Sequence, residues 1–376
     1  MALLSLKLGT IAFGGPAAHI AMLQDEVVRR RHWLTEEEFL DRLGASNLVP
    51  GPSSTELVIH VGYRRAGWPG LVVAGICFIL PAALMVTALA WAYVRFGTLP
   101  AVAGLLYGVK PAVIAIVLHA LWDFARTAVK NLWLLLVGLA TAALGVAGMN
   151  AVSILLAGGL VTGLRQMLKQ RWATPVNRSA SVSWLPLLKK VMGGGAAAAT
   201  PVKLWALFGS FVKIGSVVFG SGYVLLAFLR AEFVDHRGWL TTRQLLDAVA
   251  VGQVTPGPVF TTATFIGYLI RGPMGACVAT IGIFLPAFVF VAVSAVLLPR
   301  IRRSAIAGAA LDGINVASVA IMAVVTWQLG RAAIIDWITL GLAVASMVAL
   351  FWWRLNSGWL VLAAALIGMI FGHGAI

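Results

Sequence analysis

The chain has 376 residues, of which 60% are hydrophobic and only 11% are charged, whereas soluble domains carry about 25% charged residues. So many apolar side chains cannot fit in one globular core. This excludes an ordinary soluble protein and favours an all-α polytopic membrane protein embedded in a lipid bilayer. The net charge of +15 comes from basic residues at the ends of apolar segments, as the positive-inside tendency predicts, so nucleic acid is not an expected partner.

The first half of the chain predicts a series of broken and continuous apolar segments. The first segment covers about 3–28 and is interrupted by Phe-Gly-Gly-Pro, so it is either one broken span or a hairpin. A polar amphipathic stretch follows over 34–46. The Pro-Gly-Pro motif at 50–52 then precedes a short apolar piece over 53–64, predicted to be a re-entrant or half helix because a full crossing needs about 20 residues. Four apolar runs complete about five full crossings: 69–94, 99–124, 131–148 and 150–164.

The second half of the chain repeats the first. Lys7 falls on Lys213, and Pro-Gly-Pro at 50–52 falls on 256–258, a shift of 206 residues that becomes 205 after one deleted residue. The sequence therefore predicts three parts: an N-terminal transmembrane repeat over 1–164, a basic cytoplasmic linker over 165–202, and a C-terminal repeat over 203–376.

The charges between the apolar runs indicate that the two repeats are inverted. Arg126 and Lys130 follow the run 99–124, whereas the matching run of the second half is followed by Arg331 and the acidic Asp336. Together with an odd number of crossings per half, this opposite phase predicts inverted topology. The linker is then inside, and both termini are outside.

Repeated helix breaks at membrane depth are typical of substrate sites in secondary transporters. An interrupted helix presents unpaired N–H groups and a positive dipole end, which suit an anion. The predicted oxyanion-binding residues are glycines, hydroxyl and amide side chains beside the breaks, and one lysine: Gly14, Gly15, Asn47, Gly51, Ser53, Ser54, Thr55, Lys110, Gly220, Ser221, Gly222, Gln253, Gly257, Thr261 and Thr262. The residues expected to break the helices are Pro16, Pro50, Pro52, Pro256 and Pro258. The alternative for any single break is a kink or cap without a ligand.

Glu56 is the candidate coupling residue, because proton coupling needs a titratable group at membrane depth and its counterpart in the second half is the neutral Thr262. The alternative is a capping role at the start of the short helix. Lys110 lies beside Pro111 in a long apolar run and is expected to have an anion or a carboxylate as its partner.

Other charged residues are repeated near the first break of each half. Lys7 and Lys213 either attract an anion or extend to the membrane interface. Glu26 is expected to form a salt bridge with Arg29 or Arg30, and Glu232 with Arg237. Lys7 and Lys213 lie near the start of the first segment of each half, whereas Glu26 and Glu232 lie just before basic loop residues.

No pattern in the sequence indicates an enzyme. Cys77 and Cys277 lie in apolar runs without metal-ligand spacing, and there is no His-Glu-x-x-His motif, Walker A sequence or nucleophile–base pair. We therefore expect no catalytic residues, no metal and no cofactor.

The segments "FGGPAAHIAMLQDEVV" and "NLVPGPSSTE" resemble the chromate ion transporter family in its two-domain form, and "FGSGYVLLAFLRAEFV" and "QVTPGPVFTTATFIGY" are weaker copies in the second half. The resemblance implies export of chromate across the bacterial cytoplasmic membrane, chromate resistance, and secondary transport driven by the proton motive force. The family motif carries over at Gly14, Gly15, Pro16, Glu26, Asn47, Pro50, Gly51, Pro52 and Glu56. The second half departs from it at Ser221, Gly222 and Thr262, which puts an equivalent coupling role there in doubt.

Two other functions remain open at this stage. One is uptake or exchange of sulfate-like oxyanions by the same site, and the other is a membrane receptor or structural subunit. The preferred oxyanion, the coupling ion and the formation of a homodimer also remain open.

Overall fold

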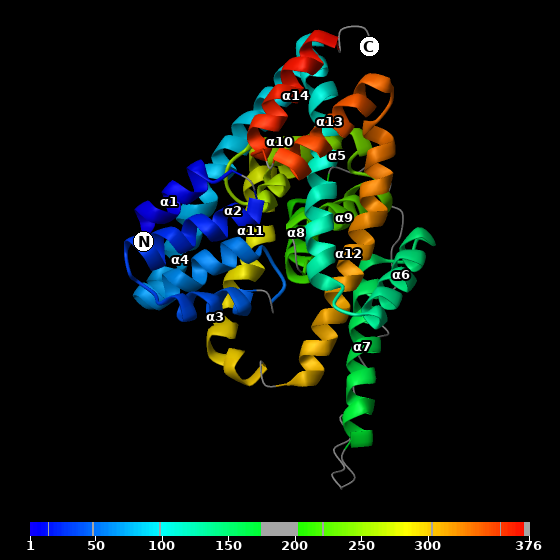
Figure 1. The fold of residues 1–376 in the computed structure, drawn as a ribbon. Coiled ribbons are helices and arrows are strands. Elements are labelled where there is room, and N and C mark those ends of the chain that lie inside the picture. Colours follow the sequence, from blue (N-terminus) through cyan, green and yellow to red (C-terminus); the bar gives the residue numbers. More distant parts are fainter. Residues whose placement is uncertain are drawn as a thin grey trace.

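The computed structural model describes residues 1–13, 15–46, 49–97, 99–173, 202–219, 222–301, 304–353 and 355–371. Every regular element in this part of the chain is helical, which confirms the all-α prediction (Figure 1). Five segments in it are long and apolar enough to cross a bilayer: Ser53–Phe96, Val102–Ala128, Ala151–Gln170, Val259–Ser294 and Ala305–Ala333. Shorter apolar helices accompany them, and the chain is a multi-pass membrane protein.

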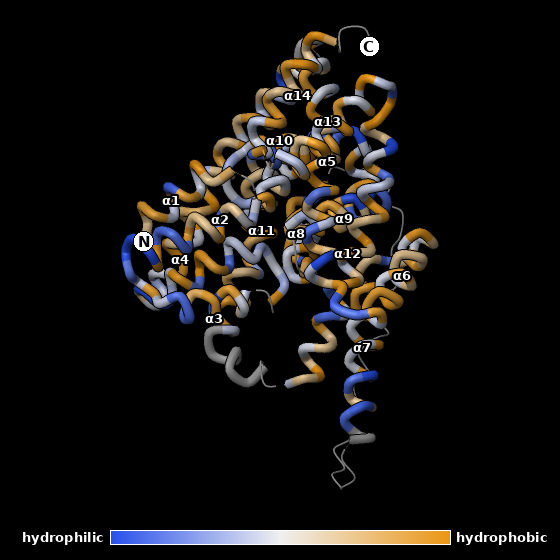
Figure 2. The backbone as a smooth tube through the Cα atoms, in the orientation of Figure 1, coloured by the Kyte–Doolittle hydropathy of each residue, from blue (hydrophilic) through white to orange (hydrophobic). Residues whose placement is uncertain are grey.

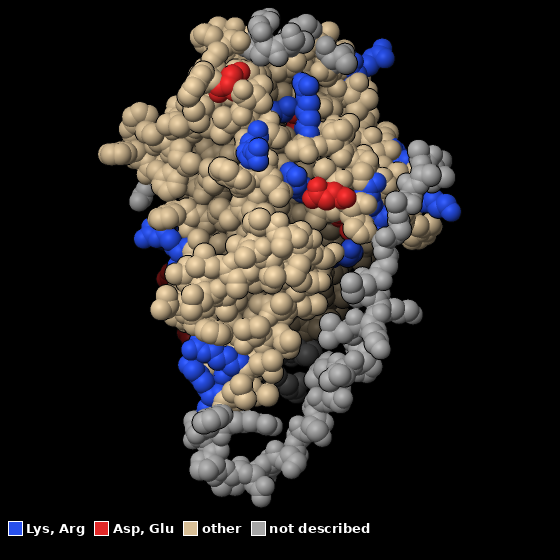
Figure 3. All heavy atoms as spheres, turned by 90° about the vertical axis from the view of Figure 1, so that its right-hand side faces the viewer, with Lys and Arg blue, Asp and Glu red and all other residues tan. Residues whose placement is uncertain are grey.

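The outer surface fits a hydrocarbon environment. Figure 2 shows hydrophobic residues along most helices, and Figure 3 shows a face on which charged side chains form only small groups. Large apolar side chains such as Leu84 and Leu139 are 60% exposed. In water such a surface would cause aggregation, whereas lipid tails can cover it.

The two repeats contain matching helices. The elements of the first are α1 Ala2–Ile11, α2 Gly15–Gln24, a π-helical turn η1 Asp25–Arg30, α3 Glu36–Ser46, α4 Ser53–Phe96, α5 Pro100–Ala128, α6 Leu132–Val146 and α7 Ala151–Ala173. Those of the second are α8 Leu204–Val217, η3 Gly222–Val224, α9 Leu225–Leu229, η4 Arg230–His236, α10 Thr242–Val254, η5 Val259–Thr261, α11 Thr262–Ile301, α12 Ala305–Ala333, α13 Trp337–Trp353 and α14 Ser357–Phe371. Since α7 continues to Ala173, the linker predicted from residue 165 begins later, and most of it lies outside the described residues.

The first segment of each repeat is a hairpin. Lys7 Nζ lies 2.6 Å from Glu26 Oε1, although 19 helical residues in a straight line would span about 28 Å at 1.5 Å per residue. Lys213 and Glu232 approach each other in the same way, at 2.9 Å. The chain thus turns back after α1, and residue 26 lies beside α1 again. The outside placement of the N-terminus assumed a full crossing between residue 7 and residue 26, so it has no support from this hairpin.

The short helix after each Pro-Gly-Pro motif is also confirmed. The long helix α4 has non-helical dihedral angles at Ala66 and Gly67, and α11 has them at Arg271 and Gly272. A Cβ atom on Gly62 would overlap the carbonyl of Gly70, so the chain reverses between these residues. Each "long helix" is therefore a half helix followed by a full crossing.

The repeats are inverted relative to each other. Lys130, just after α5, lies 2.6 Å from Asp312 near the start of α12. Tyr107, near the start of α5, donates a 2.6 Å hydrogen bond to Asp336, just after α12. The equivalent helices α5 and α12 therefore run antiparallel, as two inverted repeats require.

The repeats also exchange their last two helices. In Figure 1, α13 and α14 lie beside α5 of the first repeat, while α6 and α7 lie against α12 of the second. Small residues allow these contacts, because a Cβ atom on Gly108 would overlap the carbonyl of Ala364 and one on Gly313 would overlap that of Gly158. The breaks near the centre are thus held between helices of both repeats.

Candidate functional site

Each Pro-Gly-Pro motif is hydrogen-bonded to the broken helix of the opposite repeat. The N–H of Gly51 donates to the carbonyl of Val218 at 2.7 Å, and the N–H of Gly257 donates to the carbonyl of Ala12 at 3.1 Å. Ala12 and Val218 are the C-caps of α1 and α8, whose last carbonyls have no partner within their own helices. The two crossed hydrogen bonds therefore satisfy both helix ends reciprocally.

Glycine is needed at these motifs because of both conformation and space. Gly51 has φ +143° and Gly257 has φ +95°, which side chains disfavour. A Cβ atom on Gly257 would lie 2.7 Å from the Cβ of Ala82 on α4, and one on Gly51 would lie 3.7 Å from that of Ala287 on α11. Each motif therefore packs against the crossing helix of the other repeat.

The first break of each repeat also approaches the other. Gly15 has φ +74°, and a Cβ atom there would lie 2.9 Å from the hydroxyl oxygen of Tyr223. A Cβ atom on Gly222 would lie 3.8 Å from Pro16. The described parts of all four breaks thus meet between the repeats. Gly14, Asn47, Gly220 and Ser221 lie outside the described residues, so their predicted roles stay predictions.

Glu56 is fully buried on the first turn of α4, and neither carboxylate oxygen has a hydrogen-bond partner within the described residues. Its Oε1 lies against Gly51, where an added Cβ atom would overlap it. The alternative of a capping role is not realised, because no side-chain hydrogen bond caps α4. A carboxyl group next to the crossed Gly51 hydrogen bond is therefore free to interact with a proton or a ligand.

The neighbouring hydroxyl and amide side chains fall into two groups. Thr261 and Thr262 donate to the carbonyls of Pro258 and Val259, both at 2.8 Å, so they cap their own chain. Thr55 Oγ1 and Gln253 Nε2 are buried and have no hydrogen-bond partner within the described residues. Ser53 is buried as well, while Ser54 contacts a histidine. Among the neutral side chains predicted for the site, Thr55 and Gln253 thus have hydrogen-bonding capacity that no described residue uses.

His19 is a site residue that the sequence reasoning missed. It is 2% exposed, its Nε2 lies 3.0 Å from the carbonyl of Ala12, and its Nδ1 lies 3.2 Å from Ser54 Oγ. With Nε2–H donating to the carbonyl, Nδ1 accepts from the serine. Its counterpart in the second repeat is Leu225, so a polar group present in only one copy of the first motif was the available signal.

Lys110 has a carboxylate partner, one of the two expected kinds. Its Nζ lies 2.9 Å from Asp247 Oδ1, with the two side chains 12% and 2% exposed. The hydroxyl of Tyr93 donates to Asp247 Oδ2 at 2.8 Å. This buried triad joins α4 and α5 of the first repeat to α10 of the second. It exists once, because the counterparts of Lys110 and Tyr93 are Asn315 and Leu298.

Lys7 and Lys213 each have a carboxylate partner in the protein, which neither expectation for them named. Glu26 contacts Lys7 at 2.6 Å and Arg31 at 3.0 Å, with the expected Arg30 at 3.8 Å. Hydrogen bonds from Lys7 and Arg31 lower the pKa of the Glu26 carboxyl, because they favour its charged form.

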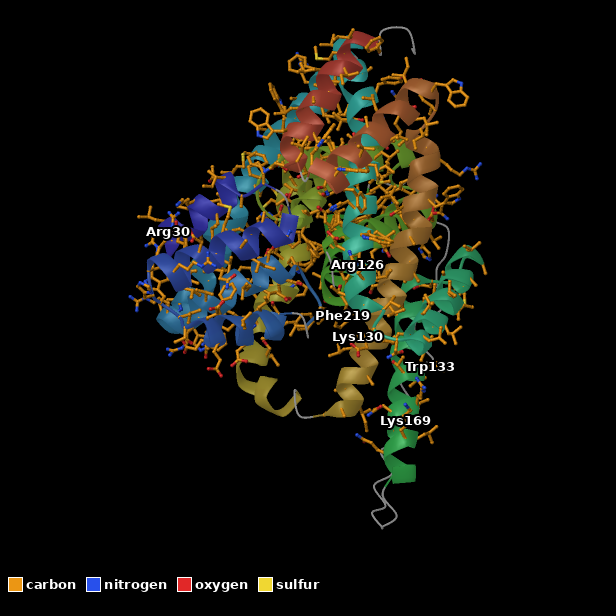
Figure 4. All side chains as sticks on the ribbon, viewed as in Figure 1. Arg30, Arg126, Lys130, Trp133, Lys169 and Phe219 are labelled. Atoms are coloured by element: carbon orange, nitrogen blue, oxygen red, sulfur yellow. The ribbon has the colours of Figure 1, made fainter. Side chains whose placement is uncertain are left out.

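Glu232 repeats this arrangement with Lys213 at 2.9 Å and the expected Arg237 at 2.7 Å. Burial works to raise the pKa of Glu232, but the hydrogen bonds from Arg237 and Lys213 outweigh it and lower the pKa. Each cluster holds together the two arms of its hairpin, away from the helix breaks. Figure 4 shows Arg30 at one edge of the molecule and Phe219, beside the α8 break, near its middle.

Comparisons with known proteins agree with this architecture. The family model described as chromate transporter matches residues 1–164 and 205–369, one copy per repeat. The chain is 33% identical to a "Probable chromate transport protein" of Synechococcus elongatus over 97% of this chain and 93% of the relative. It is 34% identical to the "Chromate transport protein" of Cupriavidus metallidurans over 97% of this chain and 91% of the relative.

A half-length relative also matches. The "Uncharacterized transporter YwrA" of Bacillus subtilis is 30% identical over 41% of this chain and 89% of its own length. No solved structure matches the chain. The relatives are named as transport proteins, which points to transport as the activity in place of catalysis.

Proposed function

Since the chain belongs to the chromate transporter family, we propose that it is a secondary transporter that exports chromate, or a closely related oxyanion dianion, from the bacterial cytoplasm. Export would confer chromate resistance, be driven by the proton motive force, and occur by alternating access around the four breaks. The end of α7, where the linker begins, is cytoplasmic in this proposal. The observation that carries it is the reciprocal pair of hydrogen bonds from Gly51 to Val218 and from Gly257 to Ala12.

These crossed hydrogen bonds suit a site that opens alternately. A rocking motion of one repeat against the other would separate Gly51 from Val218 without the same change between Gly257 and Ala12, because the motifs lie on opposite sides of the pseudo-two-fold axis. The released glycine N–H and the amide of Gln253 would then be donors for an oxyanion. Neutral donors in a low-dielectric site bind a dianion without leaving an unpaired cation when it departs.

Glu56 is the proposed coupling residue. Its carboxyl lies against Gly51, and an ionised carboxylate there would repel a dianion at the released N–H. Protonation would remove this repulsion, and loss of the proton would favour release of the anion. Proton and dianion would then move together with a net charge of −1, so the electrical part of the proton motive force, negative inside, would drive their export. The second repeat, with Thr262 at this position, would not contribute to the coupling.

Flux into proteoliposomes tests the proposal. Chromate, sulfate and molybdate are compared with and without a pH gradient for the parent protein and for Glu56→Gln, Asn47→Ala and Gln253→Ala. We expect Glu56→Gln to lose the stimulation by the pH gradient while keeping anion exchange. The amide variants should raise the chromate concentration for half-maximal flux by about tenfold, as expected for one lost charge-assisted hydrogen bond of about 1.5 kcal/mol.

The control is Glu38→Gln, which changes an exposed carboxylate whose partners, Thr35 and Arg64, are far from the breaks in sequence. If all three site variants behave like this control at equal expression, the proposed site is wrong. If sulfate enters along an imposed gradient and chromate is not exported, the sulfate-type uptake function replaces the proposed one.

A further inference from the structure

A cavity of about 450 Å³ lies between the α6–α7 turn of the first repeat and the α9–η4 segment and α12 of the second. Its wall includes Asn150, Ala231, His236, Ile321 and Gln328. A buried water needs about 10–15 Å³ of such volume, so this cavity has room for many waters and for a hydrated ion. Amide and imidazole groups in the wall make it suitable for an aqueous solute.

A smaller cavity of about 40 Å³ continues this space toward the breaks. It shares Asn150, Ala151, Ala231 and His236 with the larger cavity, and it extends to Lys213 and Val217 on α8. Val217 is the last residue of α8 and directly precedes Val218, whose carbonyl accepts the N–H of Gly51. The inner end of the space therefore reaches the residue next to a crossed hydrogen bond.

The corresponding positions of the first repeat carry an ion pair. Ala231 and His236 are the counterparts of Asp25 and Arg30. Arg30 Nε lies 2.7 Å from Asp25 Oδ2, which links residues 25 and 30 across the turn η1. Alanine and histidine cannot form this pair in the second repeat, and there the cavity occupies the equivalent place. The sequence therefore shows that the two repeats differ at these two positions.

The carboxylates at the cavity are neutralised by neighbouring cations. Lys213 and Arg237 share Glu232 at 2.9 and 2.7 Å, and Arg230 lies 3.5 Å from Asp235. Lys213, Glu232 and Asp235 line the two cavities, and both carboxylates are paired with cations, so neither presents an unpaired negative charge. Lys213 keeps half of its side chain exposed and lines the inner cavity, where its remaining N–H groups can contact a passing anion.

From these observations we propose that this space is the aqueous vestibule through which the oxyanion travels between the break at Val218 and the outer membrane face, an inference that rests on the proposed transport function. The segments 148–150 and 231–237 that line or flank it fall on the same, outer side in the inverted topology. The first repeat carries the Asp25–Arg30 pair at the equivalent place, and in this proposal the pair closes it. The transporter is then open to one face only, as alternating access requires.

Reaction of introduced cysteines with a membrane-impermeant, positively charged methanethiosulfonate tests the vestibule. Ala231→Cys and Ile321→Cys are made after replacing Cys77 and Cys277, and only variants that retain chromate flux are scored. Val344→Cys is the control, because its side chain is 55% exposed on α13 yet faces lipid in a membrane. We expect both vestibule cysteines to react at least tenfold faster than the control, from the outer face only, and chromate to slow them.

A second measurement transfers the ion pair of the first repeat. Ala231→Asp with His236→Arg should close the outer end of the vestibule and slow the labelling of Ile321→Cys about tenfold. Each single change should slow it less. Labelling no faster than the control, labelling from the inner face, or fast labelling that no transported oxyanion slows would each overturn the vestibule. Absence of flux in the parent protein would instead refute the proposed function, and it is seen before any cysteine is introduced.

Discussion

A lysine in the middle of an apolar helix is costly unless a carboxylate or an anion accompanies it. Lys110 is paired with Asp247 at 2.9 Å, and the hydroxyl of Tyr93 occupies the second carboxylate oxygen. Because Asp247 lies on α10, the helix that leads into the second Pro-Gly-Pro motif, the pair joins the two repeats there. Whether Lys110 also binds the transported anion can be separated from its pairing with Asp247 by changing both partners.

A double-mutant cycle makes this separation. Lys110→Met alone and Asp247→Asn alone each leave one charge buried and unpaired, which costs about 3–5 kcal/mol. We expect both single variants to lower the midpoint of thermal unfolding in detergent, and the double variant to recover most of the loss. The measurement is unfolding followed by tryptophan fluorescence, combined with chromate flux.

Flux in the double variant decides the role of the lysine. If the pair only holds the repeats together, the double variant transports at a rate close to that of the parent. If stability recovers while flux does not, Lys110 contacts the anion as first predicted. Tyr93→Phe is the matched control, since it removes one hydrogen bond to Asp247 and leaves both charges in place.

At the scale of single residues, the sequence predicted which side chains are unusual, but their partners were harder to predict. An apolar run containing Lys110 indicates a need for a carboxylate, and the repeat indicates that Glu56 exists in one copy. Nothing local connects Lys110 with Asp247, 137 positions later in the chain, because that contact depends on how α5 and α10 pack. His19 was missed for the same reason, since its partner Ser54 lies beyond two helices.

The broken elements gain their stability from the opposite repeat. A helix that ends at Ala12 or Val218 leaves carbonyls unpaired, and in a bilayer each such group costs several kcal/mol. Gly51 and Gly257 provide the missing donors. Prolines on either side cannot donate, so the central glycine N–H is the one donor of each motif.

Alanine at these glycines should therefore be harmful in both copies. Gly51→Ala places a methyl group against Glu56, and Gly257→Ala places one 2.7 Å from Ala82, in addition to about 1–3 kcal/mol of backbone strain. We expect each variant to lose most chromate flux and to unfold at a lower temperature. Flux and thermal unfolding of the purified proteins are the measurements.

Gly67→Ala is the control for backbone strain alone. Gly67 has φ +61°, but an added Cβ atom would meet nothing within 4 Å. It should therefore show the strain without the collision. If Gly67→Ala is as damaging as the two motif variants, the close approach between the repeats is not the reason for the glycines.

The prediction of broken elements succeeded where proline and glycine limit the backbone directly. Pro-Gly-Pro ends a helix in any surroundings, and the short apolar run after it predicted a half helix that the reversal at Gly67 confirms. The first segment was ambiguous, because Phe-Gly-Gly-Pro can kink a span or turn it back. The contact between Lys7 and Glu26 decides for a hairpin, and the two residues alone did not reveal it.

At the scale of the whole molecule, the two repeats are interlocked. The helices α13 and α14 pack on α5, and α6 and α7 pack on α12, so neither repeat encloses its own central helix. Repetition and charge phase predicted the inversion, which depends on patterns along the chain. The exchange of helices could not be predicted, because an apolar helix face shows that it is buried but not which helix covers it.

Interlocking predicts how the halves behave as separate chains. We expect residues 1–173 or 202–376 expressed alone to be degraded, because α5 or α12 would lack its covering helices. Expressed together, they should assemble, co-purify through a tag on one half and restore part of the chromate flux. The half-length relative in Bacillus subtilis is consistent with halves made as independent chains.

Substitutions on α12 test whether the exchanged helices hold the halves together. Gly313→Leu would fill the contact with Gly158 and Thr162 of α7, whereas a side chain on Gly308 of the same helix would meet nothing within 4 Å. We expect Gly313→Leu to abolish co-purification of the halves and Gly308→Leu to leave it intact. A stable, monodisperse single half, or equal behaviour of the two variants, would show that each repeat folds around its own helices and that the contacts between α7 and α12 do not hold the molecule together.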